Sequence, residues 1–296
     1  MACSRNGAMQ TALTLAEKLM PRLANEFQRR LLAATMQSVQ EVSNPLRLNN
    51  FSASFRELFR HVLVEFAPDH HVLETSWFAP DAKNAGKVTR AQKVNYVVHG
   101  GLDPAYVEGE LGIDVPAERQ ALLKTIDRLS KFTHVNEDSF GSSSQEVDQQ
   151  ALAACEALRA FLDCADSTRK LLCSRIEERV HEDVVSEAIG DTILSLDEIA
   201  THHCIDGVEV HQIEVTSMDH AEIQFIAHGS VGVQLQWGSN SDMRRGDGAV
   251  IQDSYPLTCK FYSKVETPEE LEMIKDSLCV DTSSWWDGYC DEGEPS

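Results

Sequence analysis

The stretch from Asn50 to Pro68 constrains the fold more strongly than the rest of the chain does. Its apolar residues recur every three or four positions, so they form one stripe along a helix. Ser54 and Glu57 have capping-box spacing near its start, and Pro68 must end it because proline has no backbone N–H. Such a stripe has to face a core, which predicts a helical domain around it. The apolar residues are Phe51, Phe55, Leu58, Phe59, Val62, Leu63 and Phe66.

The opposite face of this helix is polar and carries Arg56, Glu57, Arg60 and His61. Glu57 and His61 are four residues apart, so the carboxylate can orient the imidazole. A fixed guanidinium stabilises charge on a phosphorane, and an imidazole moves the proton of a 2′-hydroxyl or a leaving oxygen. These groups suit RNA cleavage that needs no metal. The pattern Arg-x4-His resembles the signature of the HEPN superfamily of ribonucleases and toxins.

Two other arginine–histidine pairs have similar spacing. They are Arg128 with His134 and Arg175 with His181. Only Arg56 and His61 lie in the middle of a helix with a continuous apolar stripe behind them, so we expect the active site there. A second helix, predicted over 117–134, ends with Lys131 and His134 three residues apart on one face. If it packs beside the first helix, these two groups add a cation and a proton donor for phosphate.

The charge divides unevenly along the chain. The total is −21, yet residues 1–134 hold 16 Lys and Arg against 14 Asp and Glu, a net charge of +2. Residues 135–296 hold the remaining 10 and 33, a net charge of −23. Because the second half repels a phosphate backbone, an RNA-cleaving site is predicted in the first half.

The chain changes from helical to strand period near residue 202. Helices are predicted over 9–42 with a break at Pro21, 90–99, 117–134, 143–164 and 167–190. Strands are predicted over 208–217, 221–228, 230–237 and 249–263, with an interruption at Pro256, and Pro268 is expected to open a short helix. The predicted class is α+β: a HEPN-like helical catalytic domain over 1–201, an antiparallel β domain over 202–280 and an acidic tail over 281–296.

The remaining features exclude several other classes. There is no run of 18 apolar residues and no signal peptide, which predicts a cytoplasmic protein outside the membrane. Eight cysteines without a Cys-x2-Cys pair predict neither a disulfide framework nor a zinc site. No cofactor and no metal are predicted for the leading hypothesis.

The order of the segments resembles a bacterial family described as predicted pPIWI-associating nucleases of phage and plasmid conflict systems. The resemblance rests on the Arg-x4-His region, Lys131-Phe-Thr-His134, the segment 235–248 with its Gly-Ser-Asn-Ser-Asp-Met-Arg-Arg-Gly-Asp-Gly end, and Val280-Asp-Thr-Ser-Ser-Trp-Trp-Asp. It implies a nuclease role and proteins of a defence system as partners, but it brings no established catalytic residues.

Three functions follow from these patterns. The first is a metal-independent endoribonuclease of a defence or toxin system that acts as a homodimer on RNA. Its predicted catalytic residues are Arg56, His61 and Glu57, and its predicted substrate-binding residues are Arg60, Lys131, His134, Arg244 and Arg245. The second is a metal-dependent nuclease with Mg²⁺ on Asp242, Asp247 and Asp253. The third is a non-catalytic acidic module that binds or neutralises a basic partner.

Overall fold

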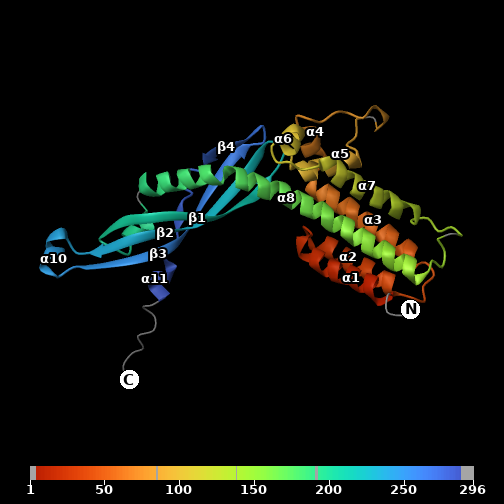
Figure 1. Ribbon diagram of the computed structural model, residues 1–296, viewed down its shortest axis with the longest axis horizontal. Coiled ribbons are helices and arrows are strands. Elements are labelled where there is room, and N and C mark those ends of the chain that lie inside the picture. The colour runs from red at the N-terminus through yellow and green to blue at the C-terminus, as the bar shows by residue number, and fades with distance from the viewer. Residues whose placement is uncertain (1–4, 85, 138, 191–192, 288–296) are drawn as a thin grey trace, which may run out of the picture. The chain divides into compact units, whose positions relative to one another are not determined.

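The computed structural model confirms the predicted α+β class. It describes residues 5–84, 86–137, 139–190 and 193–287. The chain divides into two compact units, Met1–Thr168 and Arg169–Ser296, the first helical and the second built on an antiparallel sheet (Figure 1). The domain limits at 201 and 280 stay a prediction, because a unit of dense contacts need not be a domain that folds alone.

Helices make up the first unit. In chain order they are α1 (Arg5–Leu19), η1 (Met20–Arg22), α2 (Glu26–Gln40), α3 (Arg47–Phe66), α4 (Asp69–Leu73), η2 (Ala82–Asn84), α5 (Arg90–His99), α6 (Pro104–Gly109), α7 (Val115–Lys131) and the first part of α8 (Ser144–Gly190). Helix α3 contacts α2, α5 and α7 and is therefore the centre of this unit. Within the described residues, no helix combines the length and the apolar character needed to cross a bilayer.

The apolar stripe of α3 is buried, as predicted. Phe51 and Phe55 have ring centroids 5.2 Å apart, and Phe55 and Phe59 are 5.4 Å apart, so three successive turns present tilted, contacting rings to the core. The predicted start of the helix was wrong. Helix α3 begins at Arg47, and its N-cap residue Leu46 makes no side-chain cap hydrogen bond. The end is as predicted, with Ala67 as C-cap directly before Pro68.

Other predicted boundaries depend on local chemistry. The 3₁₀ turn η1 contains Pro21 and separates α1 from α2. Thr89 and Gln92 form a reciprocal capping box at the start of α5, and Gly100 ends that helix with φ of 63°, a conformation that glycine adopts without strain. Asp103 caps α6 through the N–H of Ala105.

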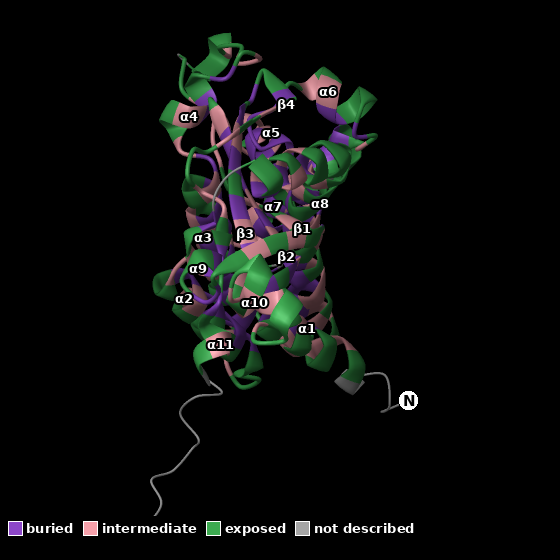
Figure 2. Ribbon diagram, turned by 90° about the vertical axis from the view of Figure 1, so that its left-hand side faces the viewer, coloured by how far each residue is buried: buried purple, intermediate pink, exposed green. Residues whose placement is uncertain are grey.

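The second unit is a sheet of long strands. They are β1 (His202–Met218), β2 (Glu222–Trp237), β3 (Ala249–Lys264), β4 (Thr267–Met273) and β5 (Cys279–Val280). The hydrogen-bonded order is β1-β2-β3-β4, and β5 also pairs with β3. Buried residues alternate along β2, with Val231, Val233 and Leu235 all inside, and Figure 2 shows buried residues of β3 in purple. The short helices α9 (Leu194–Asp197), α10 (Asn240–Arg245) and α11 (Ser283–Asp287) complete the unit.

Several segment predictions were wrong, mostly because elements are longer than predicted. The two helices predicted over 143–190 form the single helix α8, since no glycine or proline interrupts them. Pro256 lies within β3 opposite Ser230, so it does not interrupt the strand, and its carbonyl accepts the N–H of Asp281. Pro268 lies in strand β4 and opens no helix. In the acidic tail, Trp285 stacks on Trp237 at 5.3 Å, while residues 288–296 lie outside the described part of the chain.

Candidate functional site

The polar face of α3 is a solvent-facing stripe on the helical unit. At 3.6 residues per turn, its members follow one another around the helix in the order Arg56, Arg60, Glu57, His61. Arg56 and His61 are about 140° apart around the axis and form the two borders of the stripe. Arg60 is exposed, and the other three are half-buried against the neighbouring helices. The stripe exists because the buried positions of α3 from Phe55 onward are all apolar, which leaves these polar side chains on the outer side of the helix.

Three members of the stripe form a contact chain. The Nε of Arg60 donates to Oε2 of Glu57 at 2.7 Å, and Nη2 of the same guanidinium lies 2.9 Å from Nε2 of His61. The hydrogen bond from Arg60, together with the charges of Arg60, Arg56 and His61, holds the pKa of Glu57 below its ordinary value. Glu57 is therefore a carboxylate at neutral pH. Glu57 contacts Arg60 and not His61 directly. It can therefore orient the imidazole only through the guanidinium of Arg60, which contacts both residues.

His61 is positioned from the side of α2. The ring of Phe27 meets the imidazole edge to face, with centroids 4.9 Å apart. Buried Gln28 donates through Nε2 to the backbone carbonyl of His61 at 3.4 Å. The imidazole is thus held between an aromatic ring and a guanidinium, while one edge of the stripe remains open to solvent.

Phe27 is a candidate that sequence reasoning missed. It lies in α2, and although its side chain is apolar it is 57% exposed. The buried residues of α2 form a stripe made of Gln28, Leu32, Thr35, Met36 and Val39. Phe27 precedes the first of these by one residue and does not fit their helical spacing. This mismatch in spacing was the sequence signal that Phe27 faces solvent. An exposed aromatic ring beside a histidine is a platform on which a nucleic-acid base can stack.

The structure separates Lys131 and His134 from His61. Both residues are exposed, one at the end of α7 and one in the loop that follows. Asn49 fixes that loop to the start of α3, donating to the carbonyl of Phe132 at 2.9 Å and to Oγ of Ser139 at 3.1 Å. Along α3, Arg56 lies about 10 Å and His61 about 18 Å beyond Asn49. The loop that carries Lys131 and His134 is therefore fixed nearer to the Arg56 end of the stripe than to the His61 end.

The polar segment 238–248 joins β2 to β3 and contains the short helix α10. Ser239 and Asp242 form its capping box, and Gly246 ends it in the left-handed conformation. Arg245 donates to Oδ1 of Asp242 at 2.6 Å, whereas Arg244 is exposed and has no partner among the residues that the structure describes. Both arginines belong to the second unit.

The carboxylates of the metal-dependent alternative already have structural roles. Asp242 accepts from the N–H and the hydroxyl of Ser239 and from Arg245, which lowers its pKa. Asp253 accepts from the hydroxyl of Tyr255 at 2.8 Å. In the described ranges, no group of three or more His, Cys, Asp or Glu is arranged to hold a metal ion.

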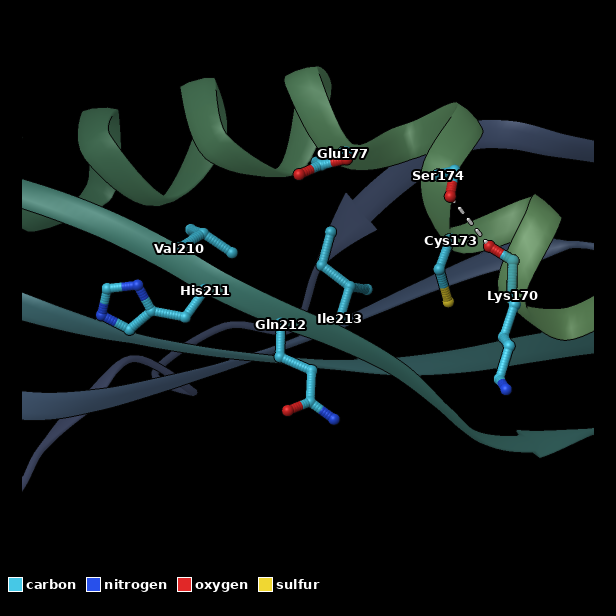
Figure 3. Close-up of a pocket in the computed structure, with 8 residues that line it drawn as sticks. All are labelled: Lys170, Cys173, Ser174, Glu177, Val210, His211, Gln212 and Ile213. Atoms are coloured by element: carbon cyan, nitrogen blue, oxygen red, sulfur yellow. Dashed lines mark hydrogen bonds between the residues drawn. The ribbon is translucent and has the colours of Figure 1, made fainter.

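A cavity in the second unit offers a different set of groups. It measures about 220 Å³ and lies between α8 and β1, with Lys170, Cys173, Glu177 and His211 among its lining residues (Figure 3). Burial raises the pKa of the Cys173 thiol to about 11, so at neutral pH it is not a nucleophile. Figure 3 shows His211 turned away from Cys173 and Lys170. The cavity therefore lacks converging catalytic groups.

Comparison with known families shows which class of protein has this fold. The chain matches two family models, which cover consecutive parts of it. Both are described as predicted pPIWI-associating nuclease, one matching residues 21–158 and the other residues 165–286. The chain therefore belongs to the predicted pPIWI-associating nucleases, as the resemblance in its sequence implied. Membership supports a nuclease role and a nucleic-acid substrate. No curated protein and no solved structure matches the chain.

Proposed function

We propose that this protein is a metal-independent endoribonuclease of a bacterial defence or toxin system, with a HEPN-like helical domain, and that it acts in the cytoplasm. The observation that carries the proposal is the Glu57–Arg60–His61 contact chain on an open face of α3. This face lies in the half of the chain with a net charge of +2, where a phosphate backbone is not repelled.

The contact between Arg60 and His61 indicates how the imidazole starts the reaction. A guanidinium has only donors, so its contact at 2.9 Å is made to an unprotonated Nε2 of His61. When an RNA phosphate approaches, Arg60 can turn to it and leave the Nε2 lone pair free. His61 then takes the proton of the 2′-hydroxyl, whose oxygen attacks phosphorus. The protonated imidazole returns this proton to the 5′-oxygen as the bond between phosphorus and that oxygen breaks. The products are a 2′,3′-cyclic phosphate and a 5′-hydroxyl.

The other members of the site bind and stabilise the substrate in this proposal. Arg56 neutralises charge on the phosphorane, and Glu57 holds Arg60 in place until the phosphate arrives. Lys131 and His134 bind the next phosphate, beside the Arg56 end of the stripe. Phe27 stacks on a base next to the scissile bond, which makes single-stranded RNA the preferred substrate.

The test compares the metal-free and carboxylate mechanisms directly. We expect cleavage to persist in EDTA, to need the 2′-hydroxyl and to leave cyclic phosphate ends. We expect His61→Ala to lower kcat by about 10²- to 10⁴-fold, because it removes general acid–base catalysis. The side chain of His61 is not in the core, so circular dichroism should show an unchanged fold.

His181→Ala is the matched control, since His181 has a similar spacing to an arginine but is exposed on α8. It should retain full activity. Cleavage that stops in EDTA, survives His61→Ala and is lost in Asp242→Ala or Asp247→Ala would refute the proposed mechanism in favour of a metal-dependent nuclease. Tight binding to a protein partner without any cleavage of RNA would favour the acidic binding module.

A further inference from the structure

Arg47, the first residue of α3, is a buried cation whose hydrogen-bond partners are neutral groups. Arg47 is only 5% exposed to solvent. Nη2 donates to Oγ of Ser144 at 2.8 Å and Nη1 donates to the carbonyl of Val39 at 3.5 Å, and both partners are neutral. No carboxylate among the described residues forms an ion pair with it. A guanidinium has five N–H groups, so several of them remain available to bind a ligand. Burying this charge costs free energy that a bound anion would offset.

A cavity of about 520 Å³ lies against this guanidinium within the helical unit. That volume is in the range of small-molecule sites. Besides Arg47 and Ser144, the polar groups at its wall include the amide of Gln10 and the carboxyl of Asp148, and apolar Met9 and Val42 form part of the remainder. The wall therefore combines one cation with neutral donors, an acceptor and apolar surface.

Two helices begin at this cavity. Arg47 opens α3 and Ser144 opens α8, and the N-terminal ends of long helices carry a partial positive charge from their unpaired N–H groups. Both ends add to the charge of Arg47 and favour an anion in the cavity. Asp148 is the group of opposite sign at the wall. Burial raises its pKa although Arg47 acts in the other direction, and its oxygens have no hydrogen bond or ion pair among the described residues.

We propose that this cavity binds a small phosphate monoester whose organic part donates a hydrogen bond to Asp148, as a nucleoside monophosphate does through its base. The fork of Arg47 and the hydroxyl of Ser144 hold the phosphate, because a planar guanidinium matches the spacing of two phosphate oxygens. Met9 and Val42 contact the apolar surface of the organic part. The site uses none of the residues of the nuclease stripe, so the proposal stands independently of the cleavage mechanism.

The test is calorimetric titration of the full chain with adenosine 5′-monophosphate, guanosine 5′-monophosphate, inorganic phosphate and the two free nucleosides. We expect at least one mononucleotide to bind, inorganic phosphate to bind more weakly and the free nucleosides not to bind. Arg47→Met should weaken mononucleotide binding at least about tenfold, because it removes charge-assisted hydrogen bonds. Asp148→Ala should weaken the mononucleotide, because the acceptor for the base is lost. It should not weaken inorganic phosphate, because it removes a negative charge near the anion.

Two further variants keep the result interpretable. Methionine fills a space similar to that of the arginine stem, but if Arg47→Met fails to fold, Ser144→Ala removes one phosphate ligand at an exposed position and should weaken binding severalfold. Arg30→Met is the matched control, since Arg30 is exposed on α2 away from the cavity, and its affinity should equal that of the unaltered protein. Equal binding of nucleoside and mononucleotide, equal affinity in Arg47→Met, or no binding of any mononucleotide at millimolar concentration would overturn the proposal.

Discussion

Two histidines of the helical unit show how surroundings decide what an imidazole can do. His61 is half-buried on the surface of α3 and touches the guanidinium of Arg60, so it is within reach of a substrate. His99 is only 2% exposed, and neither ring nitrogen has a hydrogen-bond partner in the described part of the chain. It packs edge to face on Trp77 at 5.7 Å, and burial lowers its pKa to about 4. The same residue type is thus a surface group beside a cation at one position and a core residue at the other.

The buried state of His99 predicts acid sensitivity. Its pKa is about 4 when folded and 6.5 in the unfolded chain, so between these values only the unfolded chain binds the proton. The stability contribution is fully present above pH 6.5 and is lost as the pH falls towards 4. The loss is up to about 1.4 kcal/mol per pH unit and roughly 3 kcal/mol in total.

Urea unfolding at a series of pH values measures this loss. His99→Leu should flatten the decline of the free energy of unfolding between pH 6.5 and 4, because leucine has no proton to bind. His181→Leu, at an exposed position, should leave the decline unchanged. An equally steep decline in His99→Leu and in the unaltered protein would contradict the assignment.

At the scale of single elements, caps and turns follow local sequence closely. The capping box of α5 is an example: Thr89 accepts the N–H of Gln92, and Oε1 of Gln92 accepts the N–H of Thr89 at 2.8 Å. Thr89→Ala should lower the free energy of unfolding by about 1 kcal/mol. Thr125→Ala, in the middle of α7, is the control and should leave stability the same or slightly higher, since alanine favours a helix interior. Equal urea midpoints for both variants would refute the role of the cap.

Helix α10 predicts a difference between its two arginines. Arg245 is bound to Asp242, whereas Arg244 points no donor at a described residue. If α10 guides nucleic acid, Arg244→Ala should weaken RNA binding and reduce the slope of log affinity against log salt by about 0.7 to 0.9, the value for one phosphate contact. Arg245→Ala should have a smaller effect, because its charge is already neutralised. If the unaltered protein and both variants give the same binding curves over a salt series, α10 only connects β2 to β3 and does not contact nucleic acid.

At the scale of the whole molecule, the division of charge is the main feature. Residues 1–134 have a net charge of +2 and residues 135–296 of −23, so the first of these parts repels a phosphate backbone far less than the second. The geometry of α3 adds a second constraint. Arg56 and His61 lie on opposite borders of the stripe, so a second copy laid across it would bring Arg56 of the partner subunit towards His61. We therefore infer an isologous homodimer near Arg56.

Mixed variants test the dimer and the shared site together. Light scattering should show a dimer at micromolar concentration. Arg56→Ala and His61→Ala should each be inactive, but an equimolar mixture after subunit exchange should recover about a quarter of the original activity, because half of the dimers are mixed and each holds one intact site. An active monomer, or a mixture as inactive as its components, would refute the shared site.

The sequence by itself determined the features that depend on near neighbours along the chain. The stripe of α3, its stop at Pro68, the helix over 90–99 and the strand over 230–237 were predicted, because each depends on the conformational preferences and periodicity of a few consecutive residues. The family followed from segments in the same order.

Only the tertiary structure decided features that depend on partners far apart in the chain. Pro268 lies in a strand because β4 pairs with β3, and Phe27 is exposed because the neighbours of α2 bury a different stripe. Glu57 meets Arg60, although helical spacing alone equally allowed a contact with His61. Arg47 is buried beside a cavity because Ser144, 97 residues later, begins α8 next to it. Periodicity shows which face of an element is buried, but the energy of each contact is settled only when a distant segment packs against that face.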